Sequence, residues 1–469
     1  MSKEKIENGK SIESKQPNAI ITSYGIGYLL MEIWNIIFGA YVFFFYETEV
    51  GLYVWLLVLG YVIYALWNSF NDPLIGYIFD RPNFLWKKWG KRFPIIVGAA
   101  IPWFISMFMI LTPPNVDPVE GAIFIFAWMV FATCLFDSFY SMFQNNHYSL
   151  FPDKFRLDND RRKAGGIGLI LGVVGTTIGG LIPPMFISYG DKSSYSIMAI
   201  FMVAIASFFL ILMIPGIRET REMKNRYLTT DIHKEKESFF KTMRKAVKQR
   251  NFMIIVFITF IGDVAFACIM ASIHYLVKYN LQEEASFSII LFAAFLLGAV
   301  LSIPLFLKLI QKMDDNRKMH IVGIILLIVF LLNLGFYWNL YSLIIAVILL
   351  GVGQAAFKVA RFPCLADTLD EATMETGAHQ ESVYMGVQTF FMRFSLIVQA
   401  IIFAVVHVLT GFDALNERQS DLALFGIRLQ AAIIPAAFVL FGLFVFLKYY
   451  DLTPEKTAIN KQKLKELGL

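Results

Sequence analysis

Long apolar segments constrain this chain more than any other feature of its sequence. Twelve of them follow one another along nearly the whole of the 469 residues. Each has about 20 residues or more, enough for an α-helix to cross a hydrocarbon core of about 30 Å. They lie near residues 19–47, 51–79, 94–112, 121–151, 165–189, 194–216, 251–278, 285–310, 319–336, 341–369, 380–411 and 424–449. The chain is therefore predicted to be an all-α membrane protein with twelve transmembrane helices, spans 1 to 12.

Charged residues are few, and the basic ones are unevenly placed. Charged residues make up 16% of the chain, against roughly 25% in soluble domains. Lys and Arg are concentrated in the N-terminal tail, in the loops after spans 2, 4, 6 and 8, and in the C-terminal tail, whereas the other loops hold only Lys192, Lys278 and Arg418. The positive-inside rule therefore predicts that both termini are cytoplasmic in a multi-pass protein of the cell membrane. The net charge of +5 is then a signal of topology, and nucleic acid is not expected as a partner.

One long polar stretch divides the spans into six and six. Two six-helix bundles related by an axis along the membrane normal are the architecture of the major facilitator superfamily. The predicted organisation is an N-terminal tail (1–18), a first bundle (19–216), a central cytoplasmic loop (217–250), a second bundle (251–449) and a C-terminal tail (450–469).

Motifs typical of enzymes and metal sites are missing from the sequence. Cys134, Cys268 and Cys364 lie inside predicted spans without metal-ligand spacing, and the six His form no zinc motif. Because no nucleophile and base stand together either, we expect neither enzymatic activity nor a cofactor.

Span 5 has a face of small residues. Gly168, Gly172, Gly175 and Gly179 recur at helical spacing. The segment lacks the Lys-Ser/Thr that would hold a phosphate, and no strand precedes it. Small residues let another helix approach closely in lipid, so this face is predicted to pack against a helix, within one chain or between two.

Seven charged residues lie well inside the spans, away from their ends. Such residues are costly in lipid and are candidates for function by default, normally facing the bundle interior and paired. They are Glu32, Asp72 and Asp137 in the first half, and Asp263, Lys358, Arg361 and Arg393 in the second. Because acids predominate in one half and bases in the other, we expect the halves to attract each other across a central cavity.

Asp72 is the candidate cation ligand. It lies one helical turn from Asn68, with Tyr64 one turn further along the same face. Pro73 cannot donate to the carbonyl of Ser69, which leaves that oxygen available to another partner. A carboxylate, an amide and a released carbonyl fit a proton or a small hard cation. The alternative is a kinked helix whose Asp72 is only salt-bridged across the bundle.

Span 4 carries a polar and aromatic stripe. Amides and carboxylates bind hydroxyl groups while rings cover apolar sugar faces, so a cavity for a hydroxyl-rich solute is one interpretation. Hydrogen bonding between helices is the other. The stripe consists of Asp137, Tyr140 or Ser141, Gln144 and Tyr148; Tyr28, Glu32 and Asn35 in span 1, and Gln388, Thr389 and Arg393 in span 11, would form the opposite walls.

The basic residues of the second half have two predicted roles. Arg393 lies deep in its span and is expected to hold Asp72, Glu32 or Asp263 ionised, so that cation binding loosens the pair. Lys358 and Arg361 are nearer the predicted cytoplasmic end, where snorkelling or gate salt bridges are the simpler explanation.

Several motifs connect the chain to a known family. They are YGIG (24–27), FFYETEVGL (44–52), NDPLIGYIFDR (71–81), WGKRFP (89–94), YSLFPDKFRLDNDRR (148–162), ADTLDEATMETGAHQESVYMGVQTF (366–390) and GIRL (426–429). With them the chain resembles, nearly end to end, the glycoside-pentoside-hexuronide:cation symporters, the melibiose-permease-like branch of the major facilitator superfamily.

The resemblance implies a role for several positions. Asp72, with Asn68 and Ser141, matches the cation-binding region. Polar and aromatic residues match the sugar cavity: Glu32, Tyr140, Tyr148, Gln388, Thr389 and Arg393, the last replacing a Lys. Asp137, Asp263 and Lys358 are assigned to charge coupling from their buried charge alone. The superfamily's cytoplasmic gate is matched by Gly76, Asp80, Arg81, Gly90, Lys91 and Arg92.

Three positions depart from the family pattern. Gln144 or Asn145 stands where melibiose-type carriers have a second sugar-binding Asp, and Ile170 stands where they have an Arg, so a galactoside is not the expected solute. Asn68 replaces a second cation-site carboxylate, which favours protons over sodium.

The predicted function is import of a glycoside, pentoside, hexuronide or related sugar derivative with H+ or Na+, by alternating access. Its partners are the bilayer and a small sugar-type solute, and the protein is expected to work as a monomer with no cofactor beyond the coupling ion. The alternatives are a lysophospholipid or amphiphile carrier of a related branch, suggested by the many Phe, and a transporter-like receptor or scaffold without transport.

Overall fold

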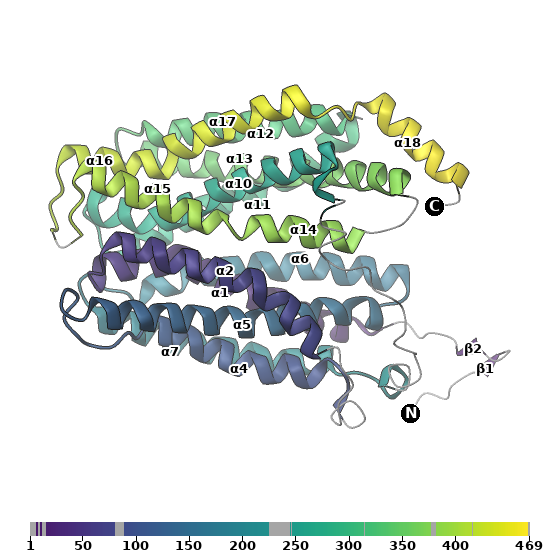
Figure 1. The fold of residues 1–469 in the computed structure, drawn as a ribbon, viewed down its shortest axis with the longest axis horizontal. Helices are drawn as coiled ribbons and strands as arrows, with labels where there is room; N and C mark the ends of the chain where they lie inside the picture. Colours follow the sequence, from purple (N-terminus) through teal and green to yellow (C-terminus); the bar gives the residue numbers. More distant parts are fainter. Residues whose placement is uncertain are drawn as a thin grey trace.

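The computed structural model describes residues 6–7, 10–11, 16–79, 89–224, 244, 246–313, 315–376, 381–414 and 416–467. Within these residues, 12 helices are long and apolar enough to cross a membrane. The predicted all-α membrane fold with twelve transmembrane helices is therefore confirmed (Figure 1).

The first bundle contains six of these helices. They are α1 (Asn18–Phe44, continued by the π-helix Phe45–Glu49), α2 (Val54–Phe79), α4 (Phe93–Ile110), α5 (Ala122–Lys154), α6 (Asp158–Leu181) and α7 (Lys192–Ile217). The 3-10 turn Pro183–Met185 follows α6.

The second bundle contains the other six spans. They are α10 (Arg250–Tyr275, continued by the π-helix Leu276–Leu281), α11 (Ser288–Met313, after the 3-10 turn Ala285–Phe287), α12 (Asn316–Gly335), α13 (Leu340–Thr376), the pair α14 (Glu381–Met392) and α15 (Ser395–Thr410), and α16 (Asp421–Arg428), which runs through the π-helix Leu429–Ile433 into α17 (Ile434–Tyr449).

The structure differs from the sequence prediction in three places. Span 11, predicted as one helix, is broken at residues 393–394 into α14 and α15. The C-terminal tail contains a further helix, α18 (Pro454–Leu467), and the N-terminal tail contains the antiparallel strand pair β1 (Ile6–Glu7) and β2 (Lys10–Ser11). Apolar length predicts the segments that cross the lipid, but it carries no information on polar helices outside it.

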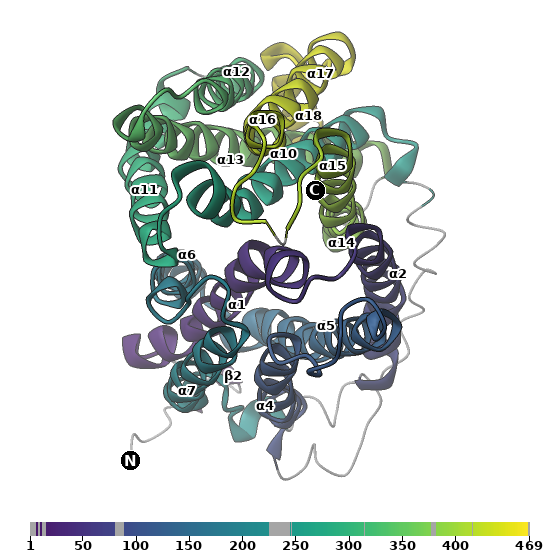
Figure 2. The ribbon, with the colours of Figure 1, turned by 90° about the vertical axis from the view of Figure 1, so that its left-hand side faces the viewer.

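The two bundles lie side by side, with α1 at the centre (Figures 1 and 2). Helix α1 packs against α6 and α7 in its own bundle and against α10 of the other. Two further pairs, α2 with α15 and α6 with α11, join the bundles. Because α1 is surrounded by protein, its polar side chains face other helices rather than lipid.

The glycine face of α6 lies against α1. A Cβ atom at Gly175 would overlap the carbonyl of Leu29, and one at Gly179 would lie 2.8 Å from the carbonyl oxygen of Ile33. Only glycine permits this backbone approach. The prediction of a helix-packing face is confirmed, and its partner is in the same chain.

Candidate functional site

Charged side chains of both bundles meet between α1, α10 and α13. Glu32 and Asp263 are half-buried, whereas Lys358 is exposed although it lies at the middle of the 37-residue helix α13. Lys358 is within electrostatic range of both carboxylates, and its Nζ lies 4.1 Å from the centre of the Phe266 ring. An exposed lysine at the middle of a spanning helix is expected to face a water-accessible opening between the bundles rather than lipid.

Two of the three residues predicted to couple charge are thus brought together. Asp263 and Lys358 interact, and Arg361 is also within electrostatic range of Asp263. Asp137 lies on α5 in the other bundle, where it contacts asparagines of α2. The structure therefore separates Asp137 from the other two.

A tyrosine and two amides form the wall of this opening in the first bundle. The hydroxyl of Tyr140 accepts hydrogen bonds from Gln144 Nε2 at 2.5 Å and from Asn35 Nδ2 at 3.4 Å. Tyr140 is within electrostatic range of Glu32 and of Arg393 from the opposite bundle. The predicted stripe of α5 and the polar face of α1 therefore do meet.

A second pair of rings extends this wall. The ring of Tyr148 lies 5.8 Å from that of Tyr28, centre to centre, and the Tyr148 side chain is 45% exposed. Exposed ring faces beside carboxylate and amide groups can stack on a sugar ring.

The two polar residues of α14 lie in different surroundings. Gln388 is buried, and its Oε1 has no hydrogen-bond partner among the described residues. Thr389 is exposed, and its hydroxyl donates to the Met385 carbonyl at 2.9 Å. Their assignment to the solute site stays a prediction.

The candidate cation site centres on Asn68 of α2. Asn68 is buried and donates from its side-chain amide to Asp137 Oδ1. Asn71 Nδ2 donates to the other carboxylate oxygen, Oδ2, at 3.1 Å. Ser141, one turn along α5 from Asp137, is buried with no hydrogen-bond partner for its hydroxyl among the described residues. The side chain of Asp72 lies outside the described residues.

Arg393 reaches this cluster from the second bundle. It stands at the break between α14 and α15, and its guanidinium donates to the Asn68 carbonyl at 2.7 Å. A free carbonyl was predicted one residue later, at Ser69, as a consequence of Pro73. The helix break explains how a long basic side chain extends towards α2.

The predicted gate is partly described. Gly90 adopts φ +100°, and a Cβ atom there would overlap the Glu219 carboxylate. Glu219 Oε2 accepts from the backbone amides of Arg92 at 3.0 Å and Phe93 at 3.1 Å, where α4 begins. The Arg92 side chain donates to Asn146 Oδ1 at 3.1 Å. The glycine of the gate motif is therefore required by its backbone conformation.

The structure says less about the other predicted gate residues. Gly76 lies in α2, Lys91 lies between Gly90 and Arg92, and Asp80 and Arg81 lie outside the described residues. Sequence reasoning missed Glu219; the available signal was an acid directly after span 6, next to Arg218.

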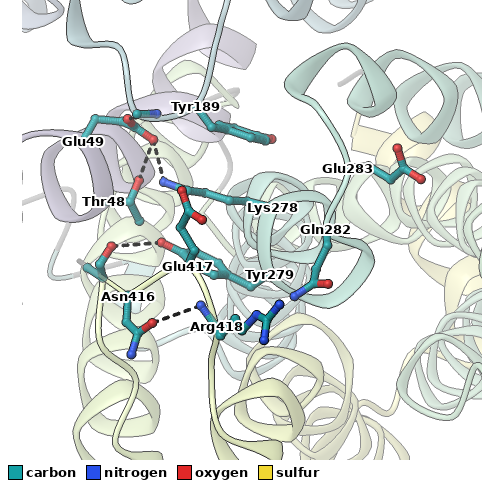
Figure 3. Close-up of a pocket in the computed structure, with 12 residues that line it drawn as sticks. Thr48, Glu49, Tyr189, Lys278, Tyr279, Gln282, Glu283, Asn416, Glu417 and Arg418 are labelled. Atoms are coloured by element: carbon teal, nitrogen blue, oxygen red, sulfur yellow. Dashed lines mark hydrogen bonds and ion pairs between the residues drawn. The ribbon is translucent and has the colours of Figure 1, made fainter.

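At the end opposite the termini, an ion pair and buried hydrogen bonds join the bundles. Glu47 accepts a hydrogen bond from the Tyr275 hydroxyl, and its Oε1 lies 2.7 Å from His407 Nδ1. Glu49 pairs with Lys278 at 2.9 Å and accepts from the Gly190 amide at 2.7 Å (Figure 3). We call the two acids with their partners Tyr275, Lys278 and His407 the latch. Its contacts join the end of α1 to the ends of α10 and α15.

A polar cavity of about 520 Å³ lies over the latch. Figure 3 shows the Lys278 ammonium beside the Glu49 carboxylate; Glu417 and Arg418 line the same cavity. The sequence motif FFYETEVGL contained both latch acids, but apolar length alone placed them at a span end, where a charge has no special meaning.

Comparison with known proteins gives the family. Residues 23–453 match the family described as MFS/sugar transport protein. The putative sulfoquinovose importer of Escherichia coli (strain K12) is 24% identical over 462 residues, which cover 95% of this chain and 94% of the importer. The isoprimeverose transporter of Lactiplantibacillus pentosus is 25% identical over 457 residues, which cover 94% of this chain and 91% of the transporter. The sodium-dependent lysophosphatidylcholine symporter 1 of Xenopus tropicalis is 20% identical over 440 residues, which cover 85% of this chain and 80% of the symporter.

A solved structure shares the fold. The nucleoside transporter NupG superposes with a TM-score of 0.63 at 12% identity, over 93% of this chain and 100% of that chain. The molecule is thus a multi-pass transporter of the cell membrane and not an enzyme. The chain belongs to the MFS/sugar transport protein family and, within it, to the glycoside-pentoside-hexuronide:cation symporters.

Proposed function

We propose that this protein imports a glycoside, pentoside, hexuronide or related sugar derivative together with H+ or Na+. The observation that carries the proposal is a set of polar side chains between the bundles. Glu32 is within electrostatic range of Tyr140 and Lys358, and Tyr140 is within range of Arg393, which donates to the Asn68 carbonyl. Hydroxyl-binding groups and ring faces suit a sugar, and the adjoining buried carboxylate suits a cation.

The solute site is assigned to residues of both bundles. Lys358 and Arg393 add positive charge to it, which favours an anionic sugar derivative over a neutral one. The residues proposed to line it are Glu32, Tyr140, Gln144, Tyr148, Gln388, Thr389 and Arg393.

Coupling follows from the charges. A cation at Asp72, with Asn68 and Ser141, neutralises the acidic side of the opening, which frees Arg393 for the solute. Asp263 and Lys358 are proposed to respond to the same change of charge, since they lie in electrostatic range of each other.

Alternating access then requires the two ends to open in turn. Opening at the end opposite the termini breaks the latch pairs Glu49–Lys278 and Glu47–His407. Opening at the other end involves the gate residues Gly76, Asp80, Arg81, Gly90, Lys91 and Arg92. With both termini in the cytoplasm, as the distribution of Lys and Arg indicates, the latch closes the outer side.

A lysolipid is the second candidate solute. It is favoured by one observation, the similarity to the lysophosphatidylcholine symporter. One experiment distinguishes the two candidates: uptake of a panel of glycosides, uronides, sulfonated sugars and lysolipids into liposomes, under an inward pH gradient, an inward sodium gradient or neither. Uptake of a sugar driven by one gradient supports the proposal. Uptake of lysolipids alone, by folded protein, overturns it.

A further inference from the structure

A groove of about 600 Å³ runs over the surface of the second bundle, between α10 and α17. It lies where α10 begins and α17 ends, apart from the opening between the bundles. Figure 1 shows this end of α17 next to α18 and the C-terminus. With the termini in the cytoplasm, as the distribution of Lys and Arg indicates, the groove lies at the cytoplasmic boundary between lipid tails and headgroups.

The groove is basic at one end and apolar over the rest. Arg250 and Lys448 are exposed at the basic end, together with Tyr449, which is 40% exposed. The apolar part includes Met253 and Phe257. Helical rise places Phe257 about 10 Å from Arg250 along α10. A charged end followed by an apolar channel into the membrane matches the two parts of a phospholipid.

The two positive charges lie beside the same aromatic ring. The guanidinium carbon of Arg250 lies 5.7 Å from the centre of the Tyr449 ring, and Lys448 Nζ lies 5.2 Å from that centre. Like charges held beside one ring repel each other, and an anion between them relieves the repulsion. Tyrosine is also a typical residue of the membrane interface, where its hydroxyl reaches the headgroups. The basic end therefore suits a phosphate group.

The surrounding acids do not neutralise this end. No acidic residue lines the groove in the described part of the chain. Asp451 is within electrostatic range of Arg250, but its carboxylate already pairs with Lys456 at 2.8 Å and accepts from Asn251 Nδ2 at 2.8 Å. The positive charge of the groove is therefore available to a ligand.

A third cation adds to the positive potential. Arg317, in the first turn of α12, donates to the Leu447 carbonyl at 3.4 Å. Leu447 directly precedes Lys448 in the last turn of α17. Three helices of the second bundle thus bring positive charge to one place at the predicted cytoplasmic surface.

We propose that this groove is a binding site for an anionic phospholipid. The phosphate lies between Arg250 and Lys448, and one acyl chain follows the apolar part of the groove along Phe257 and Val445. Basic pockets between helices on the cytoplasmic side are suited to anionic headgroups. A bound lipid would join α17 to α10, the helix that also packs against α1 of the first bundle. The site is independent of which solute the protein carries.

The test measures lipid binding to the purified full-length protein in a non-ionic detergent. Fluorescent phosphatidylglycerol gives the affinity, and the thermal unfolding midpoint is followed as phosphatidylglycerol or phosphatidylcholine with the same chains is added. Glycerol phosphate, which has the charge but no chains, separates a lipid site from a phosphate site. A phosphatidylglycerol with a photoreactive acyl chain identifies the contacted residues by mass spectrometry of the cross-linked peptides.

Three variants are compared with the unmodified protein. The double variant Arg250→Gln with Lys448→Gln removes both charges of the groove. The double variant Lys308→Gln with Lys312→Gln is the matched control, because it removes the same charge from exposed residues near the end of α11. Val445→Trp fills the apolar part of the groove and leaves both charges in place.

We expect the groove double variant to bind phosphatidylglycerol roughly tenfold or more weakly, because two cations near the headgroup are lost. It should also lose most of the thermal shift that this lipid gives. The α11 control should stay within about twofold of the unmodified protein, and Val445→Trp should weaken binding several-fold. Phosphatidylcholine should bind more weakly than phosphatidylglycerol, and glycerol phosphate should not compete. Cross-links should lie within residues 250–257 and 444–449.

Three results would overturn the proposal. The first is equal affinity for phosphatidylglycerol in the groove double variant and the α11 control. The second is displacement of the lipid by glycerol phosphate, which would indicate a phosphate site without a chain groove. The third is cross-linking of the unmodified protein outside α10 and α17, a result that does not depend on how any variant folds.

Discussion

At the scale of single residues, the structure shows why substitution at particular positions is costly. Gly90 combines a left-handed backbone, φ +100°, with direct contact to the Glu219 carboxylate that caps the start of α4. A side chain there is strained whatever its chemistry, and it also displaces the acid. The glycine of the gate motif is thus a backbone requirement.

Replacement of Gly90 by alanine should destabilise the protein by about 1–3 kcal/mol, from strain and overlap together. The matched control is Gly98→Ala in α4, where a Cβ atom meets nothing within 4 Å. Thermal unfolding in detergent checks both variants. A Gly90→Ala midpoint equal to that of Gly98→Ala would show that the contact with Glu219 is unimportant.

At the scale of helices, close packing between α1 and α6 positions Glu32 and Tyr28 beside the opening. A Cβ atom added at Gly172 would lie 3.7 Å from the Glu32 side chain, and one added at Gly168 would lie 2.8 Å from the Tyr28 ring. The glycine face of α6 therefore lets the two helices approach closely and leaves room for the polar side chains of α1.

Gly175→Ala should lower stability by about 1–3 kcal/mol, because the new methyl group overlaps the backbone of Leu29 in a tightly packed interface. Gly166→Ala, in the same helix with nothing within 4 Å, should be neutral or up to about 1 kcal/mol stabilising. Unfolding midpoints of the two variants, measured side by side, decide the matter. Equal midpoints would mean that α6 can shift freely away from α1.

Sequence periodicity and apolar length predicted these helices well, but the irregular segments could not be found in this way. The π-helices Phe45–Glu49 and Leu276–Leu281 carry the latch residues Glu47, Glu49 and Lys278. A π-helix differs from an α-helix in its backbone hydrogen-bond pattern, and this difference leaves no trace in hydropathy. The partners of a buried charge are also set by tertiary packing: nothing in the sequence showed that Asp137 meets Asn68 and Asn71.

At the scale of the whole molecule, a few polar contacts join the two bundles at the end opposite the termini. The latch is buried and joins α1 to α10 and α15. If one partner of a buried pair is removed, the other partner is left with an uncompensated charge. This destabilises the contact and favours separation of the two halves. In the proposed alternating-access mechanism, we therefore expect the latch to favour closure at this end of the molecule.

Glu49→Gln should weaken closure at the latch. We expect faster hydrogen exchange in residues 276–281, by about tenfold or more, since the Lys278 partner is lost. Glu283→Gln is the control, because Glu283 lines the same cavity and has no ion pair among the described residues. Equal exchange in both variants would contradict a latch function for Glu49.

Gradient-driven accumulation tests the central claim most directly. Liposomes containing the unmodified protein, or the variant Asp72→Asn, are given a transported sugar derivative at equal concentration inside and outside, and a cation gradient is then imposed. The account predicts that the unmodified protein raises the internal solute concentration above the external one, whereas with Asp72→Asn the two concentrations stay equal. Accumulation by both proteins, or by neither, would contradict cation-coupled transport through this site.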